Sequence, residues 1–154
     1  MLKAVSQEAT PNKDNNVRHI ITEMTIADLQ KLQAGMDKKI LIVKFGAEWC
    51  GPCKRIAPLF YDFIGKAPPN IIFADIDTDE NMDLFMGLKK YKMIQSIPTF
   101  LVFYGDVKRN NWFIPDDSII GADIAQVTQF FLRCQTKAGI LLNNLQNDGY
   151  SYFT

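Results

Sequence analysis

The stretch ILIVKFGAEWCGPCKRIAPLF, from Ile40 to Phe60, decides how the rest of this sequence is interpreted. Its first part is rich in β-branched and aromatic residues and is long enough for a central strand that is buried on both faces. Two cysteines, Cys50 and Cys53, follow directly, and a helical pattern then continues to about Lys66. The stretch therefore predicts a strand, a tight turn that carries the cysteine pair, and a helix that begins at that pair.

Strand and helix patterns alternate on both sides of this stretch. Before it, VRHIITEM is a strand pattern and TIADLQKLQAGM is a helical one, with Thr25 as the predicted N-cap. After it come the strand NIIFADID, a helix from the predicted cap Asp79 to about Tyr91, the strand PTFLVFY, a strand between Trp112 and Ile120, and the helix ADIAQVTQFFLRC. This order predicts an α/β fold with parallel strands joined by helices, followed by an antiparallel hairpin and a last helix.

The length and the charge of the chain limit its possible functions. It has 154 residues, which is enough for one domain with a sizeable core and too few for two comfortable ones. Apolar residues make up 47% of the chain and charged residues 22%, so it has the composition of an ordinary globular protein. Lys and Arg together number 17, as do Asp and Glu, so no net charge attracts nucleic acid or an anionic membrane. We expect neither partner.

The amino-terminal composition and the number of cysteines indicate the compartment. Residues 1–16 are polar and contain no apolar run of the kind that a secretory signal needs, and no stretch is long enough to span a bilayer. Three cysteines in such a chain do not form the even-numbered disulfide framework of small secreted proteins. We therefore expect a cytoplasmic protein whose cysteine pair has a chemical role rather than a structural one.

The position of the cysteine pair favours thiol chemistry. A cysteine attacks a disulfide only as its thiolate, which unpaired backbone N–H groups and the helix dipole favour at a helix N-terminus. Cys50 lies at such a terminus, and Cys53 follows one turn later, close enough to attack a mixed disulfide formed by Cys50. Gly51 lets the backbone turn tightly, and Pro52 stiffens the first helical turn, where its missing N–H costs nothing.

Metal binding is the alternative chemistry for a cysteine pair. A structural zinc site needs about four ligands. Besides the pair, the only cysteine or histidine residues in the chain are Cys134 and His19. Neither lies at the sequence spacing from the pair that zinc ligands usually have. The pattern therefore favours redox chemistry, and we expect no metal site and no other cofactor.

Three stretches, ILIVKFGAEWCGPCKRIAPLF, FADIDTDEN and IPTFLVF, resemble the thioredoxin family and follow the family's order of elements over residues 17–135. The resemblance implies the thioredoxin fold, a central mixed β-sheet flanked by helices, and the activity of a thiol-disulfide oxidoreductase that reduces protein disulfides. It gives Cys50 the role of nucleophile and Cys53 that of resolving thiol. The partners it implies are disulfide-containing protein substrates and an upstream reductase, in electron transport and cell redox homeostasis.

The resemblance also implies a substrate-binding surface beside the cysteine pair. In the family, the proline of the I-P-T tripeptide is cis and faces the dithiol, and this residue corresponds to Pro98. Trp49 and Ile97 match residues of the same surface, along which a bound peptide runs as an added strand. Gly121 and the following Ala122 match the glycine loop at its rim.

Two positions depart from the family pattern. Lys44 stands where most thioredoxins have a buried Asp that exchanges a proton with the second cysteine, and Gly46 replaces an aromatic residue, which opens the flank of the site. A charged Lys44, with Asp75 or else Phe73 opposite it, would stabilise thiolate and lower the pKa values of the cysteines. A neutral Lys44 would itself accept the proton of Cys53. A lysine whose ammonium reaches water would leave the dithiol unaffected.

We divide the chain into a flexible N-terminal arm, residues 1–16, a thioredoxin-like domain, residues 17–135, and a C-terminal extension, residues 136–154. The stretch Val107–Ser118 adds residues to the final hairpin. The added loop and the extension favour a second class of function, an adaptor or complex subunit in which peptide docking matters more than redox turnover. The intact WCGPC motif favours the enzyme.

Two features outside the motif have two interpretations each. Cys134 lies on an apolar helix stripe, which is typical of a small buried hydrophobic residue, and a regulatory or dimer-forming thiol is the alternative. The apolar residues of the extension either pack back on the domain or dock on a partner. These residues are Ile140, Leu141, Leu142 and Leu145.

Overall fold

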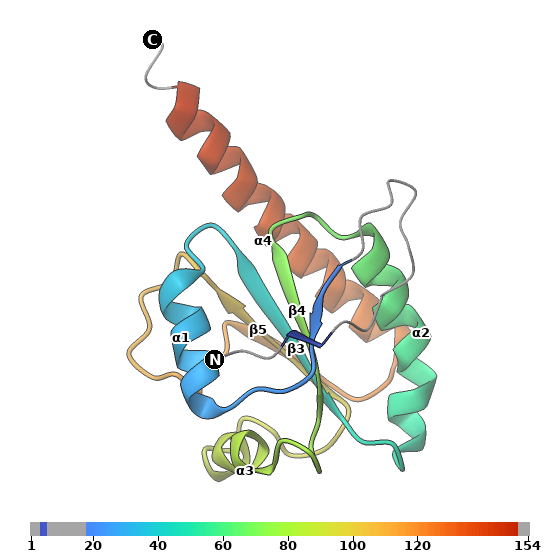
Figure 1. Cartoon of the computed structure of the whole chain (residues 1–154). Helices are drawn as coiled ribbons and strands as arrows, with labels where there is room; N and C mark the ends of the chain where they lie inside the picture. Colours follow the sequence, from blue (N-terminus) through green and yellow to red (C-terminus); the bar gives the residue numbers. More distant parts are fainter. Residues whose placement is uncertain (1–3, 6–17, 151–154) are drawn as a thin grey trace.

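The computed structural model describes the backbone of residues 4–5 and 18–150 and the side chains of residues 18–144. Within them, six strands form one mixed sheet in the order β1-β2-β4-β3-β5-β6 (Figure 1). The strands are β1 (Ala4–Val5), β2 (Ile20–Ile21), β3 (Ile40–Gly46), β4 (Ile71–Asp77), β5 (Thr99–Tyr104) and β6 (Asp117–Ile120). The helices are α1 (Ile26–Gly35), α2 (Gly51–Lys66), α3 (Met82–Lys90) and α4 (Ile124–Tyr150). The predicted α/β fold with a central mixed sheet is confirmed.

The direction of the strands follows from their connections. β2, β4 and β3 are parallel and are joined through α1 and α2. β5 pairs antiparallel with β3, and β6 pairs antiparallel with β5, which confirms the predicted final hairpin. β3 therefore lies in the interior of the sheet, and all seven of its residues are buried.

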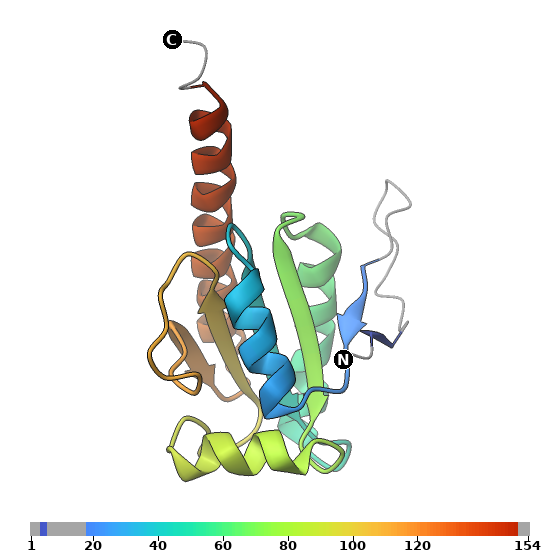
Figure 2. The same ribbon diagram turned by 60° about the vertical axis from the view of Figure 1, so that its left-hand side comes forward.

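Alternation along β3 divides the interior into two cores, because successive side chains of a strand point to opposite faces. Ile40 and Ile42 face the core that contains buried residues of α2 and α4. Leu41 and Val43 face the core that contains buried residues of α1 and α3. Figures 1 and 2 show these helix pairs on the two sides of the sheet. By the same alternation, Lys44 falls on the side of α2 and α4.

The starts of two helices test the predicted caps. The Thr25 side chain accepts the backbone N–H of Asp28, and the Asp28 carboxylate accepts that of Thr25, so the predicted capping box of α1 is confirmed. The predicted cap of α3 is wrong, because α3 begins at Met82, after Asn81 rather than after Asp79. The reason is a turn at Asp77, whose carboxylate accepts the backbone N–H groups of the second and third residues that follow it.

Helix α4 is much longer than the sequence pattern predicts. It continues without a break past residue 135, the predicted end of the domain, and its second half projects beyond the sheet (Figures 1 and 2). Ala138 and Leu141 are buried in the core with α2, and the Asn70 side chain donates to the carbonyl oxygen of Ala138. This part of the predicted extension therefore packs on the domain, while Ile140 is half exposed. The side chain of Leu145 lies outside the described residues.

The predicted N-terminal arm lies mostly outside the described residues. The exception is β1, which pairs antiparallel with β2. The strand predicted over VRHIITEM is confirmed only at Ile20–Ile21.

The added stretch Val107–Ser118 packs on the helices of one face. The Phe113 ring stacks on Tyr91 at the end of α3, with 3.7 Å between ring centroids. The Gln33 side chain of α1 donates to the backbone carbonyl of Trp112. The stretch therefore covers α1 and α3 on the face of the sheet opposite α2 and α4.

Candidate active site

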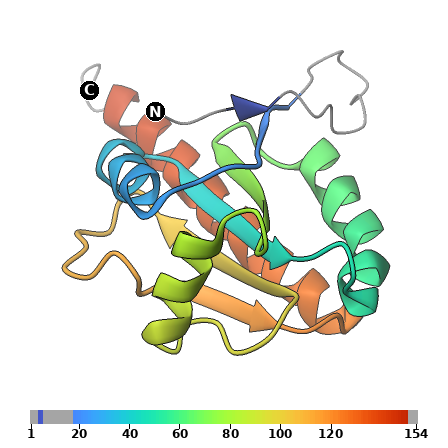
Figure 3. The ribbon, with the colours of Figure 1, turned by 60° about the horizontal axis from the view of Figure 1, so that its bottom comes forward.

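The turn from β3 to α2 carries the cysteine pair, at the same end of the molecule as α3 (Figures 1 and 3). Cys50 is the N-cap of α2, and Cys53 lies in its first turn with Gly51 and Pro52 between them. The two cysteines form a disulfide with their Cα atoms 5.2 Å apart. The predicted pair is thus able to cycle between a dithiol and a disulfide.

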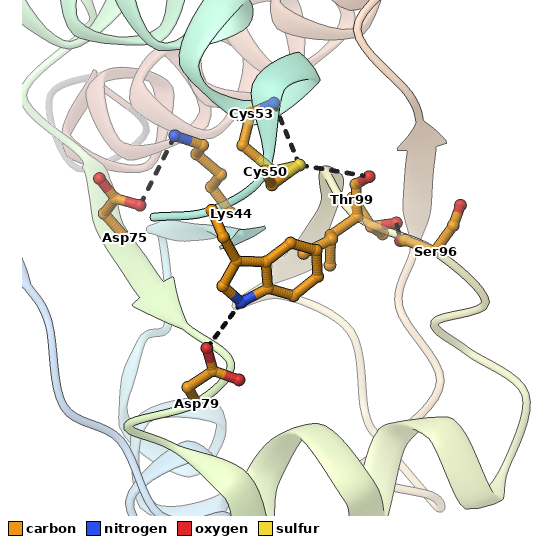
Figure 4. Close-up of a disulfide and its surroundings, with 9 residues drawn as sticks. Lys44, Cys50, Cys53, Asp75, Asp79, Ser96 and Thr99 are labelled. Atoms are coloured by element: carbon orange, nitrogen blue, oxygen red, sulfur yellow. Dashed lines mark hydrogen bonds and ion pairs between the residues drawn. A yellow bond between two sulfur atoms is a disulfide. The ribbon is translucent and has the colours of Figure 1, made fainter. Parts of the chain in front are cut away.

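The helix N-terminus surrounds Cys50 with the features that favour a thiolate. The backbone N–H of Cys53 donates to Cys50 Sγ over 3.3 Å (Figure 4). Pro52 stands in the first turn, where helices tolerate a missing N–H. A charge on Cys50 Sγ would therefore meet both a donor and the positive end of the helix dipole.

The predicted cis proline lies beside the pair. The bond between Ile97 and Pro98 is cis, and Ile97 packs against the cluster formed by Ala47 and the two cysteines. The carbonyl oxygen of Ile97 lies 3.8 Å from Cys50 Sγ. The carbonyl oxygen of Pro98 accepts the backbone N–H of Gly121 over 2.8 Å. The structure thus places Ile97 against the pair, and Gly121 is bonded to the next residue, Pro98.

Gly121 has a backbone conformation that favours glycine. Its φ angle is +98°, a region that residues with a side chain rarely adopt. This conformation lies at the end of β6, where the Gly121 N–H bonds to Pro98. A side chain at this position would therefore disturb the rim of the site.

Trp49 forms the exposed edge of the site. Its side chain is 70% exposed, and the indole N–H donates to the Asp79 carboxylate over 2.8 Å. Sequence reasoning missed this role of Asp79 and gave it a helix cap instead. The contact arises because β3 and β4 are parallel neighbours, so that the residues following them meet at one edge of the sheet.

Lys44 is buried on the inner side of the pair, with 6% of the residue exposed. Its partner across the strands is Asp75, whereas Phe73 lies opposite Ile42. Lys44 Nζ lies 3.8 Å from Asp75 Oδ1 and 5.6 Å from the centre of the Phe60 ring. Of the two predicted neighbours, the structure therefore selects the acid partner, Asp75.

Tyr61 is a member of this group that sequence reasoning missed. Its hydroxyl donates to Asp75 Oδ2 over 2.5 Å. Burial, together with the bond to Asp75 and its charge, raises the pKa of Tyr61, so the phenol keeps its proton and remains a donor. Tyr61 lies on α2, eight residues beyond Cys53, and a spacing of about two helical turns is the only signal that could have pointed to it.

A cavity of about 360 Å³ opens beside the inner side of the pair. Its walls come from β3, α2 and β4, and Gly46 forms part of them. A carbon at the Cβ position of Gly46 would lie 3.3 Å from Cys53 Sγ and 3.8 Å from Lys44 Cε. The missing side chain at Gly46 therefore leaves the flank of Cys53 open, in agreement with the prediction.

The third cysteine is separate from this site. Cys134 is fully buried in the core between the sheet, α2 and α4, and burial raises the pKa of its thiol. This agrees with a small buried hydrophobic residue. Among the helices of the described residues, none is long and apolar enough to cross a membrane.

Fold and site together define a class of protein. A mixed α/β sheet holds a redox-active cysteine pair at the start of a helix, and Ile97, which precedes a cis proline, packs against the pair. This arrangement is that of a dithiol oxidoreductase.

Comparison with known proteins identifies the family. The model of the family described as Thioredoxin matches residues 22–116. The chain is 34% identical over 96 residues to thioredoxin H4-2 of Oryza sativa subsp. japonica, covering 62% of this chain and 68% of that protein. It is 40% identical over 72 residues to thioredoxin H1 of Arabidopsis thaliana, covering 47% and 59% respectively. This chain belongs to the thioredoxin family.

A solved structure supports the same assignment. The thioredoxin of Plasmodium falciparum is 32% identical, with a TM-score of 0.54, and the match covers 74% of this chain and 96% of that one. The matches to the two plant proteins span 68% and 59% of their length.

Proposed function

We propose that this protein reduces protein disulfides, with Cys50 as the attacking thiolate and Cys53 as the resolving thiol. The observation that carries the proposal is the Cys50–Cys53 disulfide at the first turn of α2, beside cis Pro98. Membership of the thioredoxin family supports it.

The reaction has two exchange steps. Cys50 thiolate attacks one sulfur of a target disulfide, and the other target sulfur leaves as a thiolate. Cys53 then attacks the Cys50 sulfur of the mixed disulfide and releases the second target sulfur, which leaves the internal disulfide. The N–H of Cys53 that points at Cys50 Sγ favours the charge needed in the first step. An upstream reductase is the proposed partner that restores the dithiol.

The surface around cis Pro98 is the proposed binding site for the target. Trp49 offers a large exposed ring that Asp79 holds in place, and Gly121 borders the opposite rim. A target segment that lies along Ile97 and Pro98 as an added strand would bring its disulfide to Cys50. Such a site binds through backbone contacts and accepts many sequences, which suits a general protein disulfide reductase.

The proposed setting is the cytoplasm, where the protein would serve electron transport and cell redox homeostasis. A dithiol that reduces other disulfides needs a compartment whose thiol pool is kept reduced. The adaptor alternative is not favoured, because both redox cysteines are present and close enough to form a disulfide.

Insulin reduction tests the proposal. The full chain, with an excess of a small dithiol as electron donor, is expected to accelerate insulin reduction, and Cys50→Ser is expected to reduce the rate to that of the small dithiol alone. Cys134→Ser is the matched control and keeps the rate, because Cys134 lies in the core away from the pair. The reduction potential of the Cys50/Cys53 pair is a second measurement. A value near the reducing potential of the cytosol indicates a reductase rather than an oxidant. Full activity of Cys50→Ser would refute the proposed roles.

A further inference from the structure

The resolving step needs a proton acceptor that the two cysteines do not supply. Cys53 is 4% exposed and has to become a thiolate before it attacks the mixed disulfide. Cys50 cannot take the proton at that moment, because its sulfur is bound to the target. The acceptor must therefore come from the surroundings of Cys53.

One cavity reaches Cys53 from the β3 side. Because Gly46 has no side chain, a gap is left beside Cys53 and Lys44. A carbon placed at the Cβ position of Gly46 would lie 3.3 Å from Cys53 Sγ and 3.8 Å from Lys44 Cε. From there the cavity of about 360 Å³ extends to Asp75 on β4. A polar cavity of this size accommodates waters, which can carry a proton between groups that do not touch.

Six charged side chains line this cavity: Lys44, Glu48, Lys54, Asp75, Asp77 and Glu80. Glu48, Lys54 and Glu80 are exposed to solvent. The Asp77 carboxylate already accepts two backbone N–H groups in the turn before α3. Lys44 and Asp75 remain, with 7% and 22% of their side chains exposed. They are the two groups below the surface that can respond to the charge of Cys53.

Lys44 is placed as the ion-pair partner of Asp75. Its Nζ lies 3.8 Å from the Asp75 carboxylate and 5.6 Å from the centre of the Phe60 ring, and both groups attract a cation. An ammonium has three donors and no lone pair for a further proton. Its role is therefore to hold Asp75 and to favour negative charge in the cavity.

Asp75 is held at both of its oxygens. Oδ1 faces Lys44, and Oδ2 accepts the hydroxyl of Tyr61 over 2.5 Å. These partners come from β3 and α2, so the carboxylate is fixed between the two elements that also hold Cys53 and its cavity. Asp75 lines the cavity from β4.

We propose that Asp75 is the base of the resolving step and that Lys44 and Tyr61 are its positioning residues. The proposal rests on the proposed function and deepens it. The Cys53 proton passes through the cavity to the Asp75 carboxylate, and the Cys53 thiolate attacks the Cys50 sulfur. The Cys50–Cys53 bond forms as the bond between Cys50 and the target breaks, and the target leaves as a thiolate with the bonding electron pair. Asp75 then returns its proton to solvent, from which the released thiolate is protonated.

The two exchange steps can be timed separately with one equivalent of dithiobis-nitrobenzoate and the reduced full chain. Attack by Cys50 releases the first thionitrobenzoate, and attack by Cys53 on the mixed disulfide releases the second. Asp75→Asn is expected to slow the second release roughly 100-fold or more near neutral pH, the usual contribution of a general base. The first release is expected to change by less than about twofold, because it does not use Asp75.

The pH profile separates a base from a structural residue. A carboxylate base stops working once it is protonated, so the rate of the second release in the native chain is expected to fall at low pH. In Asp75→Asn this fall at low pH is expected to disappear. Asp75→Glu is expected to restore part of the rate, because it returns a carboxylate. Glu80→Gln removes an exposed acid from the same cavity and serves as the matched control, with both releases unchanged.

A second variant keeps the test valid if Asp75→Asn leaves Lys44 without a partner and unfolds the chain. The double variant Lys44→Met with Asp75→Asn removes both charges, so no buried ion is left unpaired. It is expected to fold, as measured by circular dichroism, and to keep the slow second release. The role of Asp75 is overturned if either folded variant makes the second release within about twofold of the native rate. It is also overturned if the second release is slow but keeps the pH profile of the native chain. A native chain that releases only one thionitrobenzoate would instead overturn the proposed dithiol function.

Discussion

The two cysteines of the pair are three residues apart, yet they face different surroundings. Cys50 faces the surface side, where the Ile97 carbonyl lies 3.8 Å from its sulfur and Trp49 is 70% exposed. Cys53 faces the cavity side, where the gap at Gly46 leads to Lys44 and Asp75. We call these the surface side and the cavity side of the site.

The difference between the two sides shows how one motif serves two tasks. The surface side offers an exposed ring and a cis proline, and these suit contact with a large partner. The cavity side offers two charged groups below the surface, and these suit the transfer of a proton. A change on one side is therefore expected to affect the task of that side much more than the task of the other.

Truncation after Thr136 tests whether either side depends on the end of α4. It removes Ala138 and Leu141 from the core with α2, so the free energy of unfolding is expected to fall by roughly 3 kcal/mol or more. Insulin reduction at a temperature where the chain stays folded is expected to be unchanged, because the described contacts of the site involve no residue beyond Thr136. Denaturant unfolding measures the first quantity and the insulin assay the second.

A chain that ends at Asn144 is the matched control for this truncation. It retains Ala138 and Leu141 and is expected to unfold at nearly the same denaturant concentration as the full chain. Equal stability of the two truncated chains would contradict the packing of α4. A folded but inactive shorter chain would show that the end of α4 contributes to the site.

Trp49→Ala separates the surface side from the chemistry. It removes an exposed ring from the proposed target surface, so KM for insulin is expected to rise roughly tenfold, equal to about 1–2 kcal/mol of contact. The first thionitrobenzoate release is expected to stay near the native rate, because the small disulfide does not need that surface. Asp79→Asn, which weakens only the bond to the indole, is expected to have a smaller effect in the same direction. Equal slowing of the protein and the small disulfide would place Trp49 in the chemistry instead.

Lys44→Met tests whether the cavity side also influences Cys50. Removal of a positive charge makes a nearby thiolate less favourable, so the apparent pKa of Cys50 is expected to rise. The rise is expected to be less than about one unit, because Asp75 already balances part of the charge of Lys44. Thiolate absorbance against pH measures it, and Lys54→Met, on an exposed part of the same cavity, is the matched control. An unchanged titration would limit Lys44 to the positioning of Asp75.

The sequence predicted the surface side well because its information is local. Cys50, Gly51, Pro52 and Cys53 are contiguous, and the strand before them and the helix after them follow from short patterns. The cis bond before Pro98 was predicted from the resemblance and is confirmed. Each of these features needs only a few neighbouring residues to be recognised.

The cavity side could be predicted only in part, because it depends on register and on helix packing. The pairing of Lys44 with Asp75 was one of two alternatives, and the strand register selected it. The bond from Tyr61 to Asp75 depends on how α2 crosses the sheet, which no local pattern specifies. The cap predicted at Asp79 was wrong because the Asp77 carboxylate holds a turn at that point.

The length of α4 was missed for a related reason. Gly139 interrupts the helical pattern and weakens a helix by about 1 kcal/mol relative to alanine. Burial of Ala138 and Leu141 against the sheet compensates for that cost. Tertiary packing, rather than local propensity, thus keeps the helix intact beyond the predicted end.

The most direct test of the central claim, that Cys50 attacks and Cys53 resolves, is the capture of a target by the variant Cys53→Ser. The variant is incubated with an oxidised protein substrate, and the linked product is identified by mass spectrometry without reduction. Our account predicts a stable mixed disulfide between Cys50 and the substrate, and none with Cys50→Ser under the same conditions. A mixed disulfide that forms through Cys53 in Cys50→Ser, and not through Cys50 in Cys53→Ser, would contradict the account.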